Sequence, residues 1–311
     1  MNKDSKIFVA GHRGLVGSAI VRTLQEKGYE NVVTRTRSEV DLLNQKEVEE
    51  FFASENIDYV FDSAARVGGI YANDHYSGEF IYENTQIQTN LIHYAWKYGV
   101  KKFLFLGSVC IYPKFAEVPV KEESLLTGHL EPTNAAYAIA KISGIKMLQA
   151  YQKQYKFKSV SLMPSNLYGP GDNFHPQNGH VIPAMMSKFN NSNGKDVTFW
   201  GDGTPMREFL YSDDLADACL FAMQRFENAE LVNVGSGYNI SIKELAEKIA
   251  AVVAYDGKIN WDTSRPNGTP NRPLDYSKIS EIGWKPKHTL TSGLEKTYLW
   301  FTKKTYYENC K

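Results

Sequence analysis

Short apolar runs alternate with longer amphipathic stretches through the first half of the chain. The runs Lys6–Ala10, Asp58–Asp62 and Lys102–Leu106 are short and apolar, which is typical of buried parallel strands. Similar runs occur at Asn31–Arg35, Ser159–Met163 and Glu230–Gly235. Parallel strands joined by helices need right-handed crossovers, so the pattern predicts a doubly wound parallel α/β sheet of the Rossmann type.

Helical periodicity falls between these runs. Residues 18–27 place Ala19, Ile20 and Leu24 on one face, and long helices are predicted over residues 80–98 and from Tyr137 to about residue 155. After Asn166 the chain becomes rich in turns. We therefore predict an NADP-binding Rossmann domain over residues 1–165 and a smaller mixed α/β substrate-binding lobe over residues 166–311, with a strand near 230–235 added to the main sheet.

A glycine-spaced turn follows the first strand and precedes the first helix. Glycines there permit a tight turn and close approach to a pyrophosphate on the helix N-terminus. The turn predicts cofactor contacts by Gly11, His12, Arg13, Gly14, Leu15, Val16 and Gly17. In a doubly wound sheet the ligand crevice lies at the carboxyl ends of the strands, where Ser63, Ser108 and Pro164 also fall.

Basic residues near the second strand indicate which dinucleotide is bound. An acidic residue usually follows this strand in NAD-specific folds, whereas this chain has Arg35 and Arg37. Guanidinium groups bind a 2′-phosphate, so these residues and Arg13 favour NADP(H) over NAD(H). The alternative is that the arginines form a solvated turn.

Tyr137 and Lys141 are four residues apart on a predicted helix and therefore share one face. A Lys ammonium beside a phenol favours the phenolate, so we expect Lys141 to lower the pKa of Tyr137 and make it a proton donor to a developing oxyanion. The alternative is an ordinary amphipathic helix with one exposed lysine.

The glycine turn, Ser108 and the Tyr137–Lys141 pair, in this order, resemble the extended short-chain dehydrogenase/reductase family. The resemblance implies that Ser108, Tyr137 and Lys141 serve a carbonyl reduction. It also implies a homodimer, because the two long helices flank the usual dimer interface of that family. Further cofactor contacts that it implies are Arg37, Asp41, Leu42, Leu106, Gly107, Lys141, Pro164, Asn166, Leu167 and His180.

Cys110 and His180 form a second candidate chemical set. Carbon-bound hydrogens beside a carbonyl are acidic when the enolate oxygen is stabilised, so a thiolate on one face and an imidazolium on the other can exchange them. The alternatives are a buried small residue for Cys110 and a hydrogen-bonded polar residue for His180.

Further blocks narrow the resemblance within that family. The segments 107–114, 131–134, 166–170, 172–176, 180–183 and 200–209 are similar to the 3,5-epimerase/4-reductases that act on GDP-4-keto-6-deoxymannose. This resemblance implies epimerisation by Cys110 and His180. It also implies nucleotide-sugar contacts by Lys188, Trp200, Arg207, Asn267 and Arg272.

Two departures from that pattern leave the sugar open. Val109 stands where a second serine is common, and residues 267–272 read Asn-Gly-Thr-Pro-Asn-Arg, with Asn267 in place of a carboxylate. One alternative is therefore a dedicated C4 reductase of a related GDP-4-keto heptose, without epimerase activity. A further alternative is a non-catalytic NADP-binding protein.

Composition adds limits on partners and compartment. The 311 residues carry no net formal charge, which gives no indication of a nucleic-acid or membrane-surface partner. Three cysteines and an N-terminus without signal-peptide features favour a reducing, cytoplasmic location. No apolar run is long enough to span a membrane, and no metal site is predicted.

Overall fold

A six-stranded parallel sheet forms the larger part of the molecule in the computed structural model, which describes residues 1–175, 179–265 and 272–309. The strands lie in the order β2-β1-β3-β4-β5-β9, and each pairs in parallel with its neighbours. The doubly wound sheet predicted from the sequence is confirmed. The strand bounds are Val32–Val33 for β2, Ile7–Ala10 for β1, Tyr59–Asp62 for β3, Lys102–Leu106 for β4, Ser159–Pro164 for β5 and Glu230–Val234 for β9.

The direction in which strands are added reverses once, between β1 and β3. From β1 the chain runs outward to β2, and β3 then pairs with the opposite side of β1. A ligand crevice forms outside the carboxyl ends of the strands at such a switch point. Ala10 pairs there with Asp62, which in turn pairs with Phe105.

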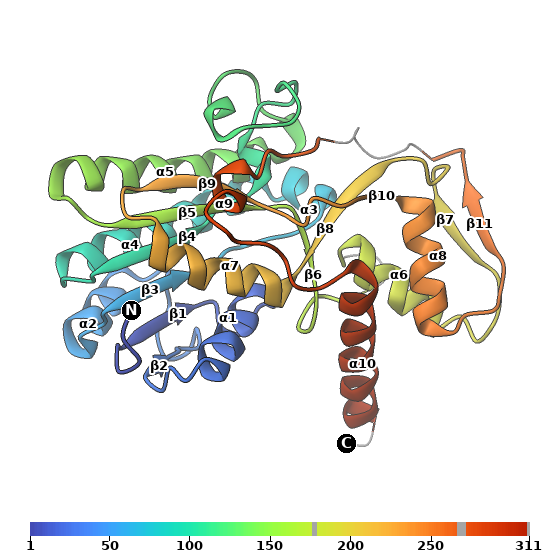
Figure 1. Cartoon of the computed structure of the whole chain (residues 1–311), viewed down its shortest axis with the longest axis horizontal. Coiled ribbons are helices and arrows are strands. Elements are labelled where there is room, and N and C mark those ends of the chain that lie inside the picture. Colours follow the sequence, from blue (N-terminus) through green and yellow to red (C-terminus); the bar gives the residue numbers. More distant parts are fainter. Residues whose placement is uncertain (176–178, 266–271, 310–311) are drawn as a thin grey trace.

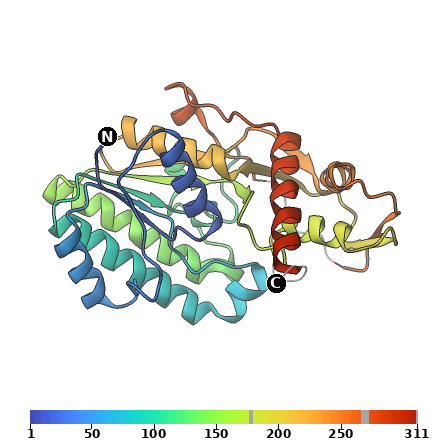
Figure 2. The same cartoon turned by 90° about the horizontal axis from the view of Figure 1, so that it is seen from below.

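Helices cover both faces of this sheet (Figure 1). Seen from below in Figure 2, α1 (Leu15–Glu26) and α7 (Ser212–Arg225) lie on one side of the strands. On the other side lie α2 (Gln45–Glu55), α4 (Ser77–Lys97) and α5 (Ala135–Tyr155). Both long helices predicted from the periodicity are present as α4 and α5.

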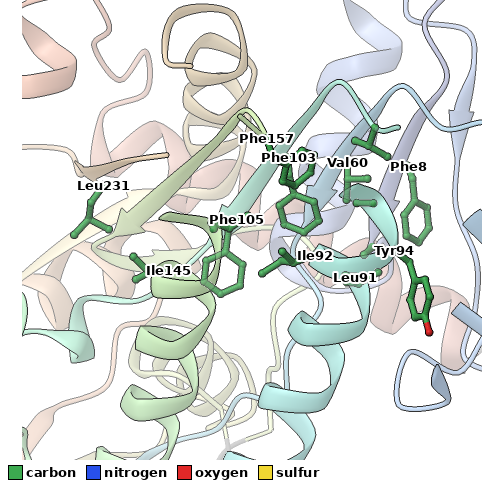
Figure 3. Close-up of a cluster of buried hydrophobic side chains, with 14 of the residues drawn as sticks. Phe8, Val60, Leu91, Ile92, Tyr94, Phe103, Phe105, Ile145, Phe157 and Leu231 are labelled. Atoms are coloured by element: carbon green, nitrogen blue, oxygen red, sulfur yellow. The ribbon is translucent and has the colours of Figure 1, made fainter. Parts of the chain in front are cut away.

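An apolar core fixes α4 and α5 against the sheet (Figure 3). Phe103 and Phe105 of β4 are fully buried there, with Leu91 and Ile92 of α4 and Ile145 of α5. Full burial of a side chain of this size contributes about 1.5–3 kcal/mol. These contacts hold the middle of α5 and the end of α4 against β4.

A smaller lobe lies beside the sheet, on the right of Figure 1. It contains a three-stranded sheet in the order β10-β8-β6 and a two-stranded sheet formed by β11 and β7. A third apolar core, which includes Met186, Phe189, Phe209 and Ile249, joins these strands to three helices. The bounds are β6 Asn166–Tyr168, α6 Val181–Asn190, β7 Val197–Trp200, β8 Met206–Tyr211, β10 Asn239–Ser241, α8 Ile242–Val253, β11 Ile259–Asp262 and α10 Leu290–Asn309.

The chain passes between the sheet and the lobe more than once. After β6 to β8 it returns as α7 and β9, and α7 packs on the main sheet while β9 pairs with β5. The short helices α3 (Ile70–His75) and α9 (Ser277–Ser280) complete the fold. The division of the sequence at residue 165 stays an interpretation, because later segments contribute to both parts.

Candidate active site

A cavity of about 990 Å³ opens at the carboxyl ends of β1, β3, β4 and β5. Ser108 and Tyr137 line it, and so do most residues predicted to contact the cofactor. Gly17 and Cys110 do not line it. The predicted cofactor residues in the lining are Gly11, His12, Arg13, Gly14, Leu15, Val16, Arg37, Asp41, Leu42, Leu106, Gly107, Lys141, Pro164, Asn166, Leu167 and His180.

The glycine turn brings bare backbone to one wall of this cavity. Gly11 has a φ of +76°, and a Cβ there would lie 2.8 Å from backbone atoms of Ser63 and Ala64. Gly17 is buried, and a Cβ on it would lie 2.1 Å from the Gly11 carbonyl oxygen. Gly17 therefore closes the turn from behind rather than facing the cavity. The missing side chains thus allow the turn to pack closely on Ser63 and Ala64, and a pyrophosphate group fits at the N-terminus of α1 that follows it.

Arg37 is more accessible to a 2′-phosphate than Arg35 is. Its side chain is 71% exposed, and its Nε lies 3.3 Å from Oδ2 of Asp41 at the cavity wall. Arg35 forms an ion pair with Glu55 of α2, and its guanidinium lies 5.4 Å from the centre of the Phe51 ring. Arg35 is therefore engaged by α2, whereas Arg37 is accessible to a ligand.

Tyr137 and Lys141 lie one helical turn apart near the start of α5. Lys141 is 4% exposed, and its ammonium donates a 2.9 Å hydrogen bond to the carbonyl oxygen of Leu106. Its Nζ lies 5.9 Å from the centre of the Tyr137 ring. The structure thus brings the pair together at the cavity, with the ammonium directed at the end of β4.

The expected lowering of the Tyr137 pKa is wrong for this structure. Burial raises the pKa of the Tyr137 phenol, and the charged forms of Cys110 and Asp62 raise the pKa further. The Lys141 ammonium, bound to Leu106, does not offset these effects. Tyr137 is therefore a neutral phenol at neutral pH, the form that can donate a proton.

Cys110 lies in a one-turn 3₁₀ helix, Val109–Ile111, that follows β4, and Ser108 is the N-cap of this helix. The Ser108 Oγ accepts a 3.4 Å hydrogen bond from the backbone N–H of Cys110. Burial raises the pKa of the Cys110 thiol to about 11, against the hydrogen bond with Ser108 and the charges of Lys141 and Arg272. Cys110 is therefore a thiol at neutral pH, and these two cations favour its thiolate.

Arg272 approaches the same loop from the far end of the chain. It donates a 2.7 Å hydrogen bond to the carbonyl oxygen of Pro113 and a 3.4 Å bond to that of Tyr112. These bonds hold the guanidinium beside the segment that follows Cys110. Its sequence-based role as a nucleotide-sugar ligand stays a prediction.

His180 stands at the N-cap of α6 on the lobe side of the cavity. Its Nδ1 lies 3.2 Å from Oδ1 of Asp172, a carboxylate that is almost fully buried. The hydrogen bond and the charge of Asp172 raise the pKa of His180, although burial opposes them. His180 is thus poised to carry a proton, as a general acid requires.

Lys188, Trp200 and Arg207 lie in the lobe and do not line the cavity. Lys188 is exposed in the last turn of α6, and Trp200, at the end of β7, is 72% exposed. Arg207 lies partly buried in β8. Asn267 lies outside the described residues. The proposed contacts of these four residues with a nucleotide sugar stay predictions.

Two buried carboxylates near the site were not singled out by sequence reasoning. Asp172 begins the segment 172–176 that contributes to the resemblance, but its role is shown by its contact with His180. Asp62 is 1% exposed at the end of β3. Asp62 could have been found from the sequence, because a charged residue at the end of an apolar strand is expected to face the switch point.

The fold and the cavity define a dinucleotide-binding enzyme of the Rossmann type with a Ser–Tyr–Lys set. The chain belongs to the NAD dependent epimerase/dehydratase family, whose characteristic sequence matches residues 7–235.

Named relatives are similar over nearly the whole chain. The putative GDP-L-fucose synthase 2 of Arabidopsis thaliana is 57% identical over 304 residues, which are 97% of this chain and 93% of the relative. A solved GDP-L-fucose synthetase from Naegleria fowleri bound to NADP gives a TM-score of 0.92 at 28% identity, covering 98% of this chain and 95% of that one. A GDP-mannoheptose C4 reductase from Campylobacter jejuni with NADP bound gives 0.89 at 38% identity, with coverages of 97% and 99%. The resemblance predicted from the motifs is confirmed.

Proposed function

We propose that this protein is an NADPH-dependent enzyme that epimerises a GDP-linked 4-keto-6-deoxy sugar at C3 and C5 and then reduces its C4 carbonyl. The observation that carries the proposal is that Ser108, Tyr137, Lys141 and His180 line one cavity with the glycine turn. Relatives named GDP-L-fucose synthase, 50–57% identical over nearly the whole chain, support this sugar. NADP-bound structural neighbours and the accessible Arg37 support NADP(H).

The reduction adds one hydride and one proton across the C4 carbonyl. NADPH supplies the hydride when it is bound. Tyr137, a neutral phenol at the cavity wall, donates its proton to the C4 oxygen as that oxygen gains charge. The Ser108 hydroxyl orients the carbonyl oxygen, and the Lys141 ammonium stabilises the phenolate that Tyr137 becomes.

The epimerisation removes a proton from one face of C3 or C5 and returns a proton to the other face. These carbons are acidic because the resulting enolate places its charge on the C4 oxygen. The Cys110 thiol first loses its proton to water, a loss that the charges of Lys141 and Arg272 favour, and the thiolate then takes the carbon-bound proton and becomes a thiol again. His180 donates as an imidazolium, a form that Asp172 favours, and becomes neutral imidazole. Proton exchange with water restores both groups.

The test is NADPH oxidation with GDP-4-keto-6-deoxymannose, with the product stereochemistry read by NMR. We expect NADPH consumption and a product inverted at C3 and C5. Reduction without inversion would favour the second candidate below. Absence of NADPH oxidation with every GDP-4-keto sugar tried would overturn the proposal and would revive the non-catalytic alternative.

The second candidate is a C4 reductase of a GDP-4-keto heptose. The structural similarity to a GDP-mannoheptose C4 reductase at 38% identity favours it. The higher identity to proteins named GDP-L-fucose synthase favours the first candidate. Comparing kcat/KM for ketohexose and ketoheptose nucleotides separates the two.

We also propose a homodimer in a reducing, cytoplasmic compartment. Tyr82 on α4 is 63% exposed and Ile139 on α5 is 45% exposed, which suits an interface across these helices. Cys110 and Cys219 are both free cysteines, which suits a reducing compartment. Within the described residues, none of the helices has the length and apolar character for a membrane span. Light scattering of the purified protein tests the dimer.

A further inference from the structure

The carboxylate of Asp62 lies buried beneath the active site without full hydrogen bonding. Asp62 is 1% exposed, and its Oδ1 accepts a 3.1 Å hydrogen bond from the backbone N–H of Ala64. Its Oδ2 has no hydrogen-bond partner among the described residues. A buried carboxylate oxygen is costly to leave unpaired, so a nearby positive charge is expected.

Lys141 is the cation that this position offers. Asp62 pairs in register with Phe105, and the side chains of both residues lie on the face of the sheet that α4 and α5 cover. The Lys141 Nζ lies 4.6 Å from the centre of the Phe105 ring and donates to Leu106, the next residue of β4 (Figure 3 shows Phe105). The ammonium and the carboxylate therefore share one buried space beneath α5.

We propose that Asp62 is a positioning residue of the reduction, whose carboxylate keeps the buried Lys141 ammonium charged and directed at the end of β4. The inference rests on the proposed function, in which Lys141 stabilises the phenolate of Tyr137. A fully buried ammonium tends to lose its proton, and a second buried charge of opposite sign opposes that loss.

Among the described residues, Cys110 and Tyr137 are the titratable groups coupled to this pair. Burial lowers the pKa of Lys141, and the charges of Asp62 and Cys110 raise it. Burial raises the pKa of Asp62 to about 6, and Lys141 opposes that rise. Tyr137 of α5 is coupled to the pair, because Asp62 adds to the effect of burial and Cys110 in raising its pKa. Gln88 of α4, which is buried and donates to Ser143 of α5, is neutral. Removal of the Asp62 carboxylate should therefore lower the pKa of Lys141.

The main test is Asp62→Asn, which can keep the hydrogen bond from Ala64 but removes the charge. The Lys141 pKa is measured by NMR of lysine-labelled protein without substrate, with the signal assigned by its loss in Lys141→Met. We expect the Lys141 titration midpoint to move to lower pH by about one unit, and the alkaline limb of kcat for reduction to move with it. An unchanged midpoint would overturn the proposal, even if activity fell.

Gln88→Met is the matched control for damage to α5 packing. Gln88 is 2% exposed and donates a 2.9 Å hydrogen bond to Ser143 of α5, but it carries no charge. We expect Gln88→Met to lower Tm without moving the Lys141 midpoint. A midpoint shift as large as that of Asp62→Asn would assign the effect to packing and overturn the charge-based role.

The wild-type protein gives an independent check if Asp62→Asn fails to fold. The Lys141 signal should respond to a group that titrates near pH 6, because protonation of Asp62 removes its charge. A Lys141 signal that is flat through this range would overturn the proposal. The NMR readouts need no sugar substrate, so they remain informative even if the proposed activity is not found.

Discussion

The side chains of the active site owe their chemistry to charged neighbours that the motifs do not contain. Ser108, Tyr137 and Lys141 could be named from the sequence because their order and spacing are characteristic. The direction in which the Tyr137 pKa is shifted could not be predicted, because it depends on burial and on Asp62, which lies on the separate strand β3. The role of Asp172 could not be predicted either, because the segment 172–176 indicates the family but not the contact with His180.

Tyr137→Phe removes the proton donor without changing the shape of the ring. We expect hydride transfer to fall by about 100-fold or more, because the C4 oxygen then gains charge without a proton. Single-turnover NADPH oxidation measures this step. Tyr155→Phe at the exposed end of the same helix is the control and should behave as wild type. Near-normal turnover by Tyr137→Phe would remove Tyr137 from the mechanism.

Cys110→Ser replaces the thiol by a hydroxyl that is much harder to deprotonate and therefore does not supply an anionic base. We expect solvent-deuterium incorporation at C3 and C5 to stop, while a ketosugar that is already epimerised is still reduced. NMR of the sugar in deuterated water measures the incorporation. Undiminished incorporation would show that another group takes the proton.

Asp172→Asn removes the charge that raises the pKa of His180. A lower pKa leaves less imidazolium at neutral pH, so the alkaline limb of the deuterium-exchange profile should move to lower pH. Recording the deuterium-exchange profile of the wild-type and Asp172→Asn proteins shows whether the limb moves to lower pH. Reduction of the epimerised ketosugar serves as the control and should be little affected. An alkaline limb that stays at the same pH would show that His180 does not donate the proton in this exchange.

At the scale of elements, the main sheet could be predicted well and the lobe poorly. Buried parallel strands are continuous apolar runs, so β1, β3, β4 and β5 follow the sequence pattern closely. The run at Asn31–Arg35 gives only the two residues Val32–Val33 as a strand. The lobe strands β6 and β10 have three residues each. They form because they pair with β8 in the folded protein, and a local sequence pattern does not indicate such pairing.

Gly17→Ala and Gly78→Ala compare two helical glycines with opposite surroundings. A Cβ on Gly17 would lie 2.1 Å from the Gly11 carbonyl oxygen, whereas one on Gly78 meets nothing within 4 Å. We expect Gly17→Ala to cost about 1–3 kcal/mol and to weaken NADPH binding, and Gly78→Ala to be neutral or slightly stabilising. Thermal unfolding and NADPH titration measure both. Equal effects would show that the turn is not closed by Gly17.

At the scale of the molecule, the cofactor-binding sheet depends on residues from beyond the predicted boundary at 165. The core on the α1 side of the sheet contains Leu215 and Met223 of α7 and Val232 and Val234 of β9. Without them one face of β5 and its free edge would be exposed.

A fragment of residues 1–165 should therefore fail to fold cooperatively. We expect no sharp thermal transition and no NADPH binding, whereas the whole chain shows both. Adding a separate peptide for residues 206–240 would partly restore binding if α7 and β9 are the missing parts. A fragment that unfolds cooperatively and binds NADPH unaided would contradict this.

The late position of β9 in the sequence also governs how the protein is made. A nascent chain that has emerged only as far as β5 still lacks the strand that seals the sheet, and roughly 65 more residues must leave the ribosome before that strand is available. Through that interval β5 presents an open edge to other chains. Slower synthesis or chaperone shortage should therefore cause aggregation of incomplete chains rather than of the finished enzyme.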